Sequence, residues 1–194
     1  MSRFPGFLKL SSLSYSETDI HSKMKKDIRV ALTGFMGVGK SSVARHLAST
    51  LRCQQIDLDR LIERNENSKV VDIIDQHGIE HYRRIETMSL TQFLETSDAR
   101  ILSLGGGTWT MAENRELLKS HGFTSVWLES TFEHCWLNIS YSRKERPLAR
   151  DKQSALKLFE ERQKVYCLAD WHIIIRPDFN SFDVARQIAE EIFS

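Results

Sequence analysis

The chain has 194 residues, with 27 basic and 26 acidic side chains and a formal net charge of +1 at pH 7. This length favours one domain with a substantial core, and the balanced charge gives no global field that would attract nucleic acid or an anionic membrane. No apolar run approaches the ~20 residues that span a bilayer. We expect a cytoplasmic monomer that binds neither nucleic acid nor membrane, and whose anion binding is local.

Residues 1–27 are rich in serine and show no strong periodicity. The apolar stretch 4–10 is interrupted by proline, glycine and lysine, which argues against a secretory signal. A transit peptide stays open, because residues 1–16 contain no acidic side chain. We favour a flexible extension in front of a single domain that covers residues 28–194.

The segment 28–42 reads IRVALTGFMGVGKSS and matches the phosphate-loop pattern G-x-x-x-x-G-K-[ST]. Ile28–Thr33 is suited to a buried parallel strand, and the chain from Ser42 onward has helical spacing. The alternative is a glycine-rich turn with a solvated lysine, but strand, loop and helix in this order favour nucleotide binding. The predicted nucleotide-binding residues are Gly37, Val38, Gly39, Lys40, Ser41 and Ser42.

The chemistry of phosphate binding explains the spacing of this loop. Glycines let successive backbone N–H groups converge on phosphate oxygens at a helix N-terminus. Lys40, which we expect on an exposed loop, can reach the β- and γ-phosphates. The Ser41 hydroxyl can complete a Mg²⁺ shell made otherwise of water and phosphate oxygens.

Two aspartates follow the second predicted strand, Gln54–Asp57. Because ligands of parallel α/β sheets lie outside the carboxyl ends of the strands, Asp57 and Asp59 are expected to face the phosphates. One carboxylate can hold metal-bound water, and the other can accept a proton from an attacking hydroxyl. The alternative is that Asp57 caps a helix that begins near Leu58.

Residues 70–96 are predicted to be mostly helical, with a break at Gly78. Within them, Arg83 and Arg84 form an arginine pair, and such a pair is usually a solvated helix face. Arg84 fits that interpretation, whereas the interpretation of Arg83 depends on the motifs that follow in the chain. The apolar positions of this region are Val71, Ile74, Ile85, Met88, Leu90 and Phe93.

The third predicted strand, Arg100–Leu104, runs into three glycines, Gly105, Gly106 and Gly107. Three glycines cost much chain entropy, which indicates that the backbone passes close to a ligand, although a flexible connection is the alternative. Further alternation of helix and strand predicts a parallel sheet. The elements are a helix at Met111–Ser120, a strand at Thr124–Leu128 and a helix at Thr131–Asn138.

Residues 140–152 contain five Arg or Lys around Pro147 and almost no apolar side chain. This segment is either a surface loop or a lid that closes over the nucleotide and excludes water. A helix is predicted at Ala155–Leu168, with Arg162 near a buried face. That face comprises Leu156, Phe159, Val165 and Leu168, and the last elements are a strand at Trp171–Ile175 and a helix at Phe182–Phe193. Cys53, Cys135 and Cys167 match no metal or redox pattern and are expected to be free thiols.

From Ile28 to the C-terminus, the order and spacing of these motifs resemble the shikimate kinases, within the nucleoside-monophosphate-kinase-like phosphate-loop proteins. The resemblance implies a three-layer α/β/α fold, with a five-stranded parallel sheet in the order 2-3-1-4-5, a substrate-binding helical segment and a lid. The residues that carry it are Gly34–Ser42, Asp57–Asp59, Tyr82–Glu86, Gly105–Gly107, Glu145–Pro147 with Arg146, and Arg162 with Tyr166.

The resemblance also implies an activity, the transfer of the γ-phosphate of ATP to the 3-hydroxyl of shikimate in aromatic amino acid biosynthesis, with Mg²⁺. Asp59 would bind the ring hydroxyls and orient or deprotonate the nucleophile. For the substrate, the resemblance implies that Arg83 and Arg162 bind the carboxylate, that Glu86 holds the substrate-binding arginine, and that the ring is contacted by Gly105, Gly106 and Gly107. Arg146 and Lys40 would neutralise phosphoryl charge. Ser41 would bind the metal directly, and Asp57 would bind it through water.

The sequence departs from the family pattern in several places. Ile79 follows Gly78 where the family usually has Glu, and 138–141 replaces an Arg-Thr pair whose Arg packs on adenine. The segment between Pro147 and Arg162 is short for the family. Trp109 replaces a small residue after the glycines and is expected to place a bulky ring near the substrate pocket.

Two other functions compete with this one. A related small-molecule kinase, such as a gluconate kinase, would share the phosphate loop but would not need an arginine pair together with three glycines. A non-catalytic nucleotide-binding protein would be expected to lose the candidate base or the lid arginine first, and Asp59 and Arg146 are both present. The motifs therefore favour shikimate phosphorylation.

Overall fold

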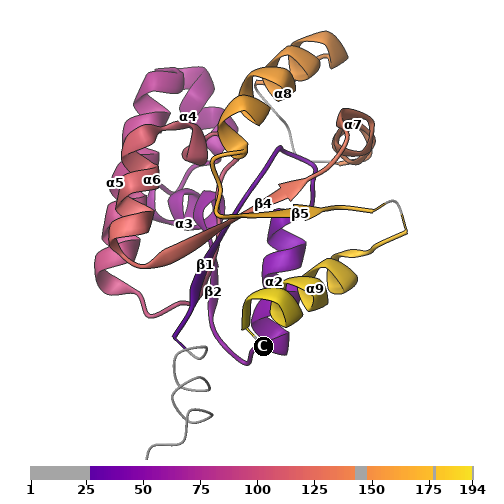
Figure 1. Cartoon of the computed structure of the whole chain (residues 1–194). Helices are drawn as coiled ribbons and strands as arrows, with labels where there is room; N and C mark the ends of the chain where they lie inside the picture. The colour runs from indigo at the N-terminus through magenta and orange to yellow at the C-terminus, as the bar shows by residue number, and fades with distance from the viewer. Residues whose placement is uncertain (1–26, 143–147, 177, 194) are drawn as a thin grey trace, which may run out of the picture.

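The computed structural model describes residues 27–142, 148–176 and 178–193 (Figure 1). In this part of the chain, five parallel strands form one sheet in the order β2-β3-β1-β4-β5. The predicted strand order is therefore confirmed. The strands are β1 (Arg29–Thr33), β2 (Gln55–Asp57), β3 (Ile101–Ser103), β4 (Phe123–Glu129) and β5 (Trp171–Ile174).

The central strand β1 explains why the sheet is parallel and covered on both faces. Its residues from Val30 to Thr33 are all buried, and β1 pairs with β3 on one side and β4 on the other. A continuous apolar run of this kind suits a strand that packs against helices on both faces. Because all five strands are parallel, their carboxyl ends lie at the same edge of the sheet.

Helices cover the two faces of this platform (Figure 1). Helices α2 and α9 pack together on one face, and α5 and α6 lie on the other, which confirms the three-layer fold. The described helices are α2 (Lys40–Thr50), α3 (Leu58–Asn65), α4 (Val70–His77), α5 (Ile79–Thr96), the 3₁₀ turn η1 (Thr108–Thr110), α6 (Ala112–Ser120), α7 (Phe132–Ser140), α8 (Lys152–Tyr166) and α9 (Ser181–Phe193).

Local signals set several of the helix boundaries. Side chains that cap helix N-termini accept backbone N–H groups: Asp57 accepts Arg60 N at α3, and Thr131 accepts His134 N at α7. Gly78, at a φ of 82°, separates α4 from α5 as the sequence predicts. These caps and breaks explain why most predicted elements agree with the structure to within a few residues.

The predicted buried face of α8 is partly wrong. Leu156 is 38% exposed, and Leu168 lies beyond the end of the helix at 59% exposure. The buried stripe instead runs along one helical face and consists of Ala155, Phe159, Arg162 and Tyr166, so it includes polar side chains. Met88 on α5, one of the apolar positions of the predicted helical region, is 71% exposed. Spacing along the helix, rather than hydrophobicity alone, decides which side chains are buried.

None of the helices in the described ranges combines the length and the apolar character needed to cross a bilayer. Cys53, Cys135 and Cys167 are free thiols, as predicted.

Candidate active site

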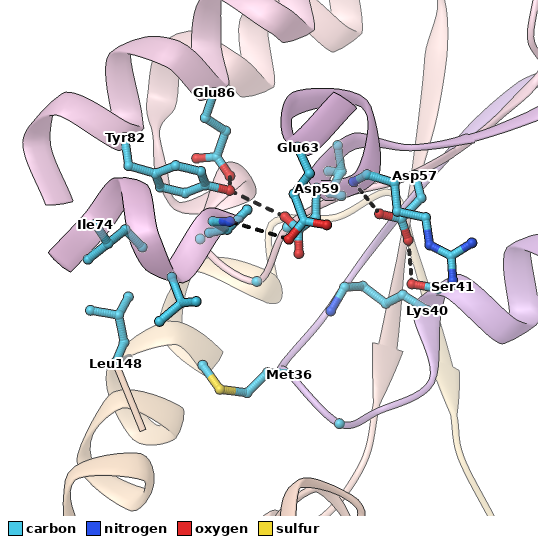
Figure 2. Close-up of a pocket in the computed structure, with 18 of the residues that line it drawn as sticks. Met36, Lys40, Ser41, Asp57, Asp59, Glu63, Ile74, Tyr82, Glu86 and Leu148 are labelled. Atoms are coloured by element: carbon cyan, nitrogen blue, oxygen red, sulfur yellow. Dashed lines mark hydrogen bonds between the residues drawn. The ribbon is translucent and has the colours of Figure 1, made fainter. Parts of the chain in front are cut away.

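The carboxyl ends of β1, β2 and β3 open into a cleft of about 990 Å³ (Figure 2). The phosphate loop follows β1, the acidic pair follows β2, and the three glycines follow β3. Helices α3, α4, α5, α7 and α8 also contribute residues to its walls. The fold therefore brings together the motifs that the sequence places far apart. The predicted site residues that line the cleft are Gly37, Gly39, Lys40, Ser41, Ser42, Asp57, Asp59, Arg83, Gly105, Gly106, Gly107 and Arg162.

The phosphate loop wraps over the N-terminus of α2. Gly37 adopts a φ of 84°, and a Cβ there would overlap the backbone carbonyl of Cys135 on α7. Asn138 on the same helix donates from Nδ2 to the Gly37 carbonyl at 2.8 Å. The glycine is thus required by both its backbone conformation and its close approach to α7. Val38, predicted to bind the nucleotide, has a buried side chain, and its contribution would come from its backbone.

Lys40 is the first residue of α2, and the expectation that it lies on an exposed loop is wrong. Its side chain extends into the cleft (Figure 2), but the residue is only 9% exposed. The ammonium group donates to the carbonyls of Gly34 at 2.8 Å and Phe35 at 3.1 Å. These carbonyls hold a positive charge at the base of the phosphate loop, because a buried ammonium requires hydrogen-bond acceptors.

Asp57 caps α3, as one of the two interpretations of the sequence predicts, and it also contacts Ser41 of the phosphate loop. Its Oδ1 accepts the Arg60 N–H at 3.2 Å and caps α3, and its Oδ2 accepts a hydrogen bond from the Ser41 hydroxyl (Figure 2). Within the described ranges, no group of three or more His, Cys, Asp or Glu side chains could by itself hold a metal. A hydroxyl beside a carboxylate fits Mg²⁺, which takes oxygen ligands and retains several waters and substrate phosphates.

Asp59 lies in the first turn of α3 and faces the cleft. The Tyr82 hydroxyl donates toward Asp59 Oδ1 at 3.3 Å and lies 3.4 Å from Glu86 Oε1, as Figure 2 shows. Tyr82 is 3% exposed, and burial, followed by the two carboxylates, raises the pKa of its phenol well above the usual value. The phenol therefore stays protonated and available as a donor.

Arg83 points its guanidinium at Glu86, one helical turn further along α5, and the two form an ion pair. Glu86 is fully buried and also accepts the Thr108 hydroxyl at 2.6 Å. Burial raises the pKa of Glu86, and the Arg83 charge opposes that rise without cancelling it. The expected support of Arg83 by Glu86 is thus present as a contact, and Arg84 is exposed, as predicted.

The glycine run makes room for charged side chains of the site itself. A Cβ on the first glycine would lie 2.8 Å from Asp59 Oδ1, and one on the second would lie 3.0 Å from Arg162 Nη1. A Cβ on Gly107 would overlap the Arg83 guanidinium. The sequence predicts a close approach of this backbone to a ligand, and the structure adds a close approach to Asp59, Arg83 and Arg162.

Arg162 comes from α8 and is 6% exposed, although it also lines the cleft. Among the residues that the structure describes, no carboxylate forms an ion pair with its guanidinium. Its neighbour Tyr166 donates a hydrogen bond to the Gly106 carbonyl, and burial raises the pKa of Tyr166 to about 12. A buried guanidinium without a carboxylate partner, near Arg83, can receive an anionic group from a ligand.

Trp109 is not placed as predicted. It does not line the cleft, is 4% exposed, and donates from its indole N–H to the Val165 carbonyl at 3.0 Å. The η1 turn directs the ring toward α8, where the N–H finds its acceptor. Arg146 and the rest of the segment 143–147, in the middle of the predicted lid, lie outside the described residues.

Sequence reasoning missed several parts of the cleft. Glu63 on α3 accepts the Val70 N–H at 3.3 Å and so connects α3 to the first residue of α4. The contact of the Tyr82 hydroxyl with Asp59 was also missed, although the i,i+4 spacing of Tyr82 and Glu86 is a signal for one shared helix face. An apolar wall faces the charged side chains and consists of Met36, Val70, Val71, Ile74, Leu104 and Leu148.

Comparison with known proteins agrees with this geometry. The sequence profile of the shikimate kinase family matches residues 36–193. The chain is similar to shikimate kinases from Persephonella marina, at 36% identity over 74% of this chain and 87% of that protein, and from Sulfurihydrogenibium, at 35% identity over 85% and 95%. The structure of a shikimate kinase from Acinetobacter baumannii in complex with shikimate superimposes with a TM-score of 0.79, at 31% identity over 87% of this chain and 95% of that one.

Proposed function

The chain belongs to the shikimate kinase family, and on that basis we propose that it transfers the γ-phosphoryl group of ATP to the 3-hydroxyl of shikimate. The observation that carries the proposal is the pair of guanidiniums, Arg83 and Arg162, that line one cleft with Lys40 and Asp59. One end of this cleft suits phosphates, and the other suits a small carboxylic acid.

In the proposed reaction, Arg83 and Arg162 bind the substrate carboxylate and so orient the ring. The substrate hydroxyl donates to Asp59, which takes its proton as the oxygen attacks the γ-phosphorus. The bond between the γ-phosphorus and the bridging oxygen breaks, and ADP leaves. Lys40 and the backbone N–H groups of residues 37–42 stabilise the charge on the phosphates.

Mg²⁺ would be held by the Ser41 hydroxyl and, through water, by Asp57, where it would neutralise phosphate charge. We place Arg146 on the transferring phosphoryl group by its resemblance to the family, since it lies outside the described residues. We further propose that the protein works as a monomer in the cytoplasm, which size-exclusion chromatography with light scattering and cell fractionation would check.

A coupled ADP-release assay tests the reaction and the substrate together. Purified protein, ATP and Mg²⁺ are supplied with shikimate, quinate, gluconate or a nucleoside monophosphate, with ATP alone as the blank. We expect shikimate to give a kcat/KM at least ~10²-fold above the other acceptors, because buried polar groups reject ligands that leave them unpaired. Preference for gluconate or for a nucleotide would contradict the proposal.

A further inference from the structure

Tyr82 is a buried hydroxyl donor placed between two carboxylates that the proposed reaction uses differently. Figure 2 shows its phenol directed toward Asp59 on one side and Glu86 on the other. Asp59 is the proposed proton acceptor, whereas Glu86 pairs with Arg83, a proposed carboxylate ligand. The hydroxyl therefore connects the proposed proton acceptor with the residues proposed to bind the substrate carboxylate.

The two carboxylates that contact the Tyr82 hydroxyl lie on different helices, Asp59 on α3 and Glu86 on α5. Glu86 accepts the Thr108 hydroxyl on Oε1 and the Arg83 guanidinium on Oε2, so it keeps two strong donors without Tyr82. The partly exposed Asp59 lies at the start of the short helix α3, at the wall of the cleft. For Asp59, the phenol is a donor from a different helix, α5, and from a side chain that is only 3% exposed. Such a donor restricts the orientation of the carboxylate.

We infer that Tyr82 is a positioning residue: its hydroxyl holds the Asp59 carboxylate in the orientation that meets the substrate hydroxyl, and ties it to the Glu86 and Arg83 pair. The inference rests on the proposed function. Tyr82 itself touches neither the phosphates nor the transferred proton. Its effect on turnover passes through Asp59, because a small misalignment of the acceptor is costly in a proton transfer.

Substitution of Tyr82→Phe removes the hydroxyl and keeps the packed ring. We expect kcat with shikimate to fall about tenfold or more, the scale of a misplaced catalytic group. The KM values for shikimate and ATP should change less than about threefold, because Arg162, Lys40 and the phosphate loop keep their contacts. The melting temperature of each variant shows that it is folded at the assay temperature.

Tyr166→Phe is the matched control. It also removes one buried phenol oxygen, but that oxygen donates to the Gly106 carbonyl beside Arg162 and not to a carboxylate. We expect Tyr166→Phe to raise the KM for shikimate more than it lowers kcat. A common pattern in the two variants would contradict the assigned role of Tyr82.

A double-mutant cycle with Asp59→Asn separates positioning from general structural damage. If Tyr82 acts through Asp59, Tyr82→Phe should cost less than about threefold in kcat when Asp59 is already Asn. An equal loss in both backgrounds, or unchanged kcat in the single variant, overturns the inference. If the wild-type protein itself fails to phosphorylate shikimate, the proposed function fails first, and the role of Tyr82 falls with it.

Discussion

The two ends of the cleft are built in different ways. The phosphate loop is one contiguous segment in front of α2, and in the proposed function it binds phosphate through backbone N–H groups and Lys40. The other end, here called the charged cluster, consists of Asp59, Tyr82, Arg83, Glu86 and Arg162, which come from α3, α5 and α8. The loop depends on local conformation, whereas the cluster depends on how three helices and a glycine turn pack.

This difference extends to how each end holds positive charge. The Lys40 ammonium donates hydrogen bonds to two neutral carbonyls, those of Gly34 and Phe35. Arg83 is balanced by the buried carboxylate of Glu86, and Arg162 has no ion pair within the described residues. Substitutions in the loop should therefore abolish chemistry, and substitutions in the cluster should separate substrate binding from turnover.

The largest effect is expected for Lys40→Ala, which removes the cation that we propose to bind the phosphates. We expect kcat/KM to fall about 10³-fold or more, the scale of a lost electrostatic donor at a transferring group. Two carbonyls also lose a buried donor, so the free energy of unfolding should fall by ~1 to 3 kcal/mol. Turnover and thermal unfolding, measured on one sample, check both, with the exposed Lys157→Ala as control. Substantial residual activity would contradict the phosphate-loop assignment.

Arg162→Ala tests the opposite end of the cleft. A desolvated hydrogen bond to a charged group is worth ~2 to 3 kcal/mol, so the KM for shikimate should rise about a hundredfold while kcat changes less. Arg162→Lys should rescue it poorly because lysine lacks the guanidinium fork. Arg84→Ala, an exposed arginine, is the control and should leave both constants unchanged. A change in ATP binding in place of shikimate binding would overturn the carboxylate role.

Gly107→Ala tests whether the glycine run is needed to make room for the guanidinium of Arg83. The new Cβ would overlap the Arg83 guanidinium, so that side chain must move. We expect the KM for shikimate to rise about tenfold, the equivalent of ~1.4 kcal/mol of lost binding.

Gly122→Ala is the comparison for this variant. Gly122 has a φ of 72° and open space around its Cβ position. Alanine there should lower stability by ~1 kcal/mol through backbone strain and leave KM unchanged. Equal KM values in wild type and Gly107→Ala would mean that Arg83 has another position from which it works equally well.

The sequence predicts the phosphate loop and the parallel sheet well because both rest on local signals, whereas the strand order follows from the resemblance to the family. Glycine conformation, the break at Gly78 and the alternation of strand and helix are all encoded within short segments. The acidic pair could also be placed, since the carboxyl ends of parallel strands meet at one edge.

The charged cluster is harder to predict because its contacts cross the fold. Hydrophobicity selects Leu156 and Leu168 for the buried face of α8, yet the buried stripe carries Arg162 and Tyr166. No spacing rule indicates that the Trp109 ring turns away from the cleft to reach the Val165 carbonyl. Such choices depend on which acceptor the tertiary structure supplies to each buried donor.

The smallest effect concerns the pH dependence of stability at Glu86, and it tests which force dominates in the charged cluster. Burial raises the pKa of Glu86 above its usual value of 4.5, despite the Arg83 partner. The unfolded chain has the usual pKa of this carboxyl group, and the folded protein has the raised one. At a pH between these two pKa values, the folded protein holds a proton that the unfolded chain has released, so stability should fall as pH rises through this window. One such group changes the free energy of unfolding by at most about 1.4 kcal/mol per pH unit. Glu86→Gln, which cannot titrate, should lose this slope, although it also loses the ion pair at every pH. Denaturant unfolding of both proteins from pH 4.5 upward gives the difference in slope. If the wild type instead gains stability over Glu86→Gln as pH rises, the attraction to Arg83 exceeds the cost of burying the carboxylate. The negative charge on Glu86 would then stabilise the charged cluster.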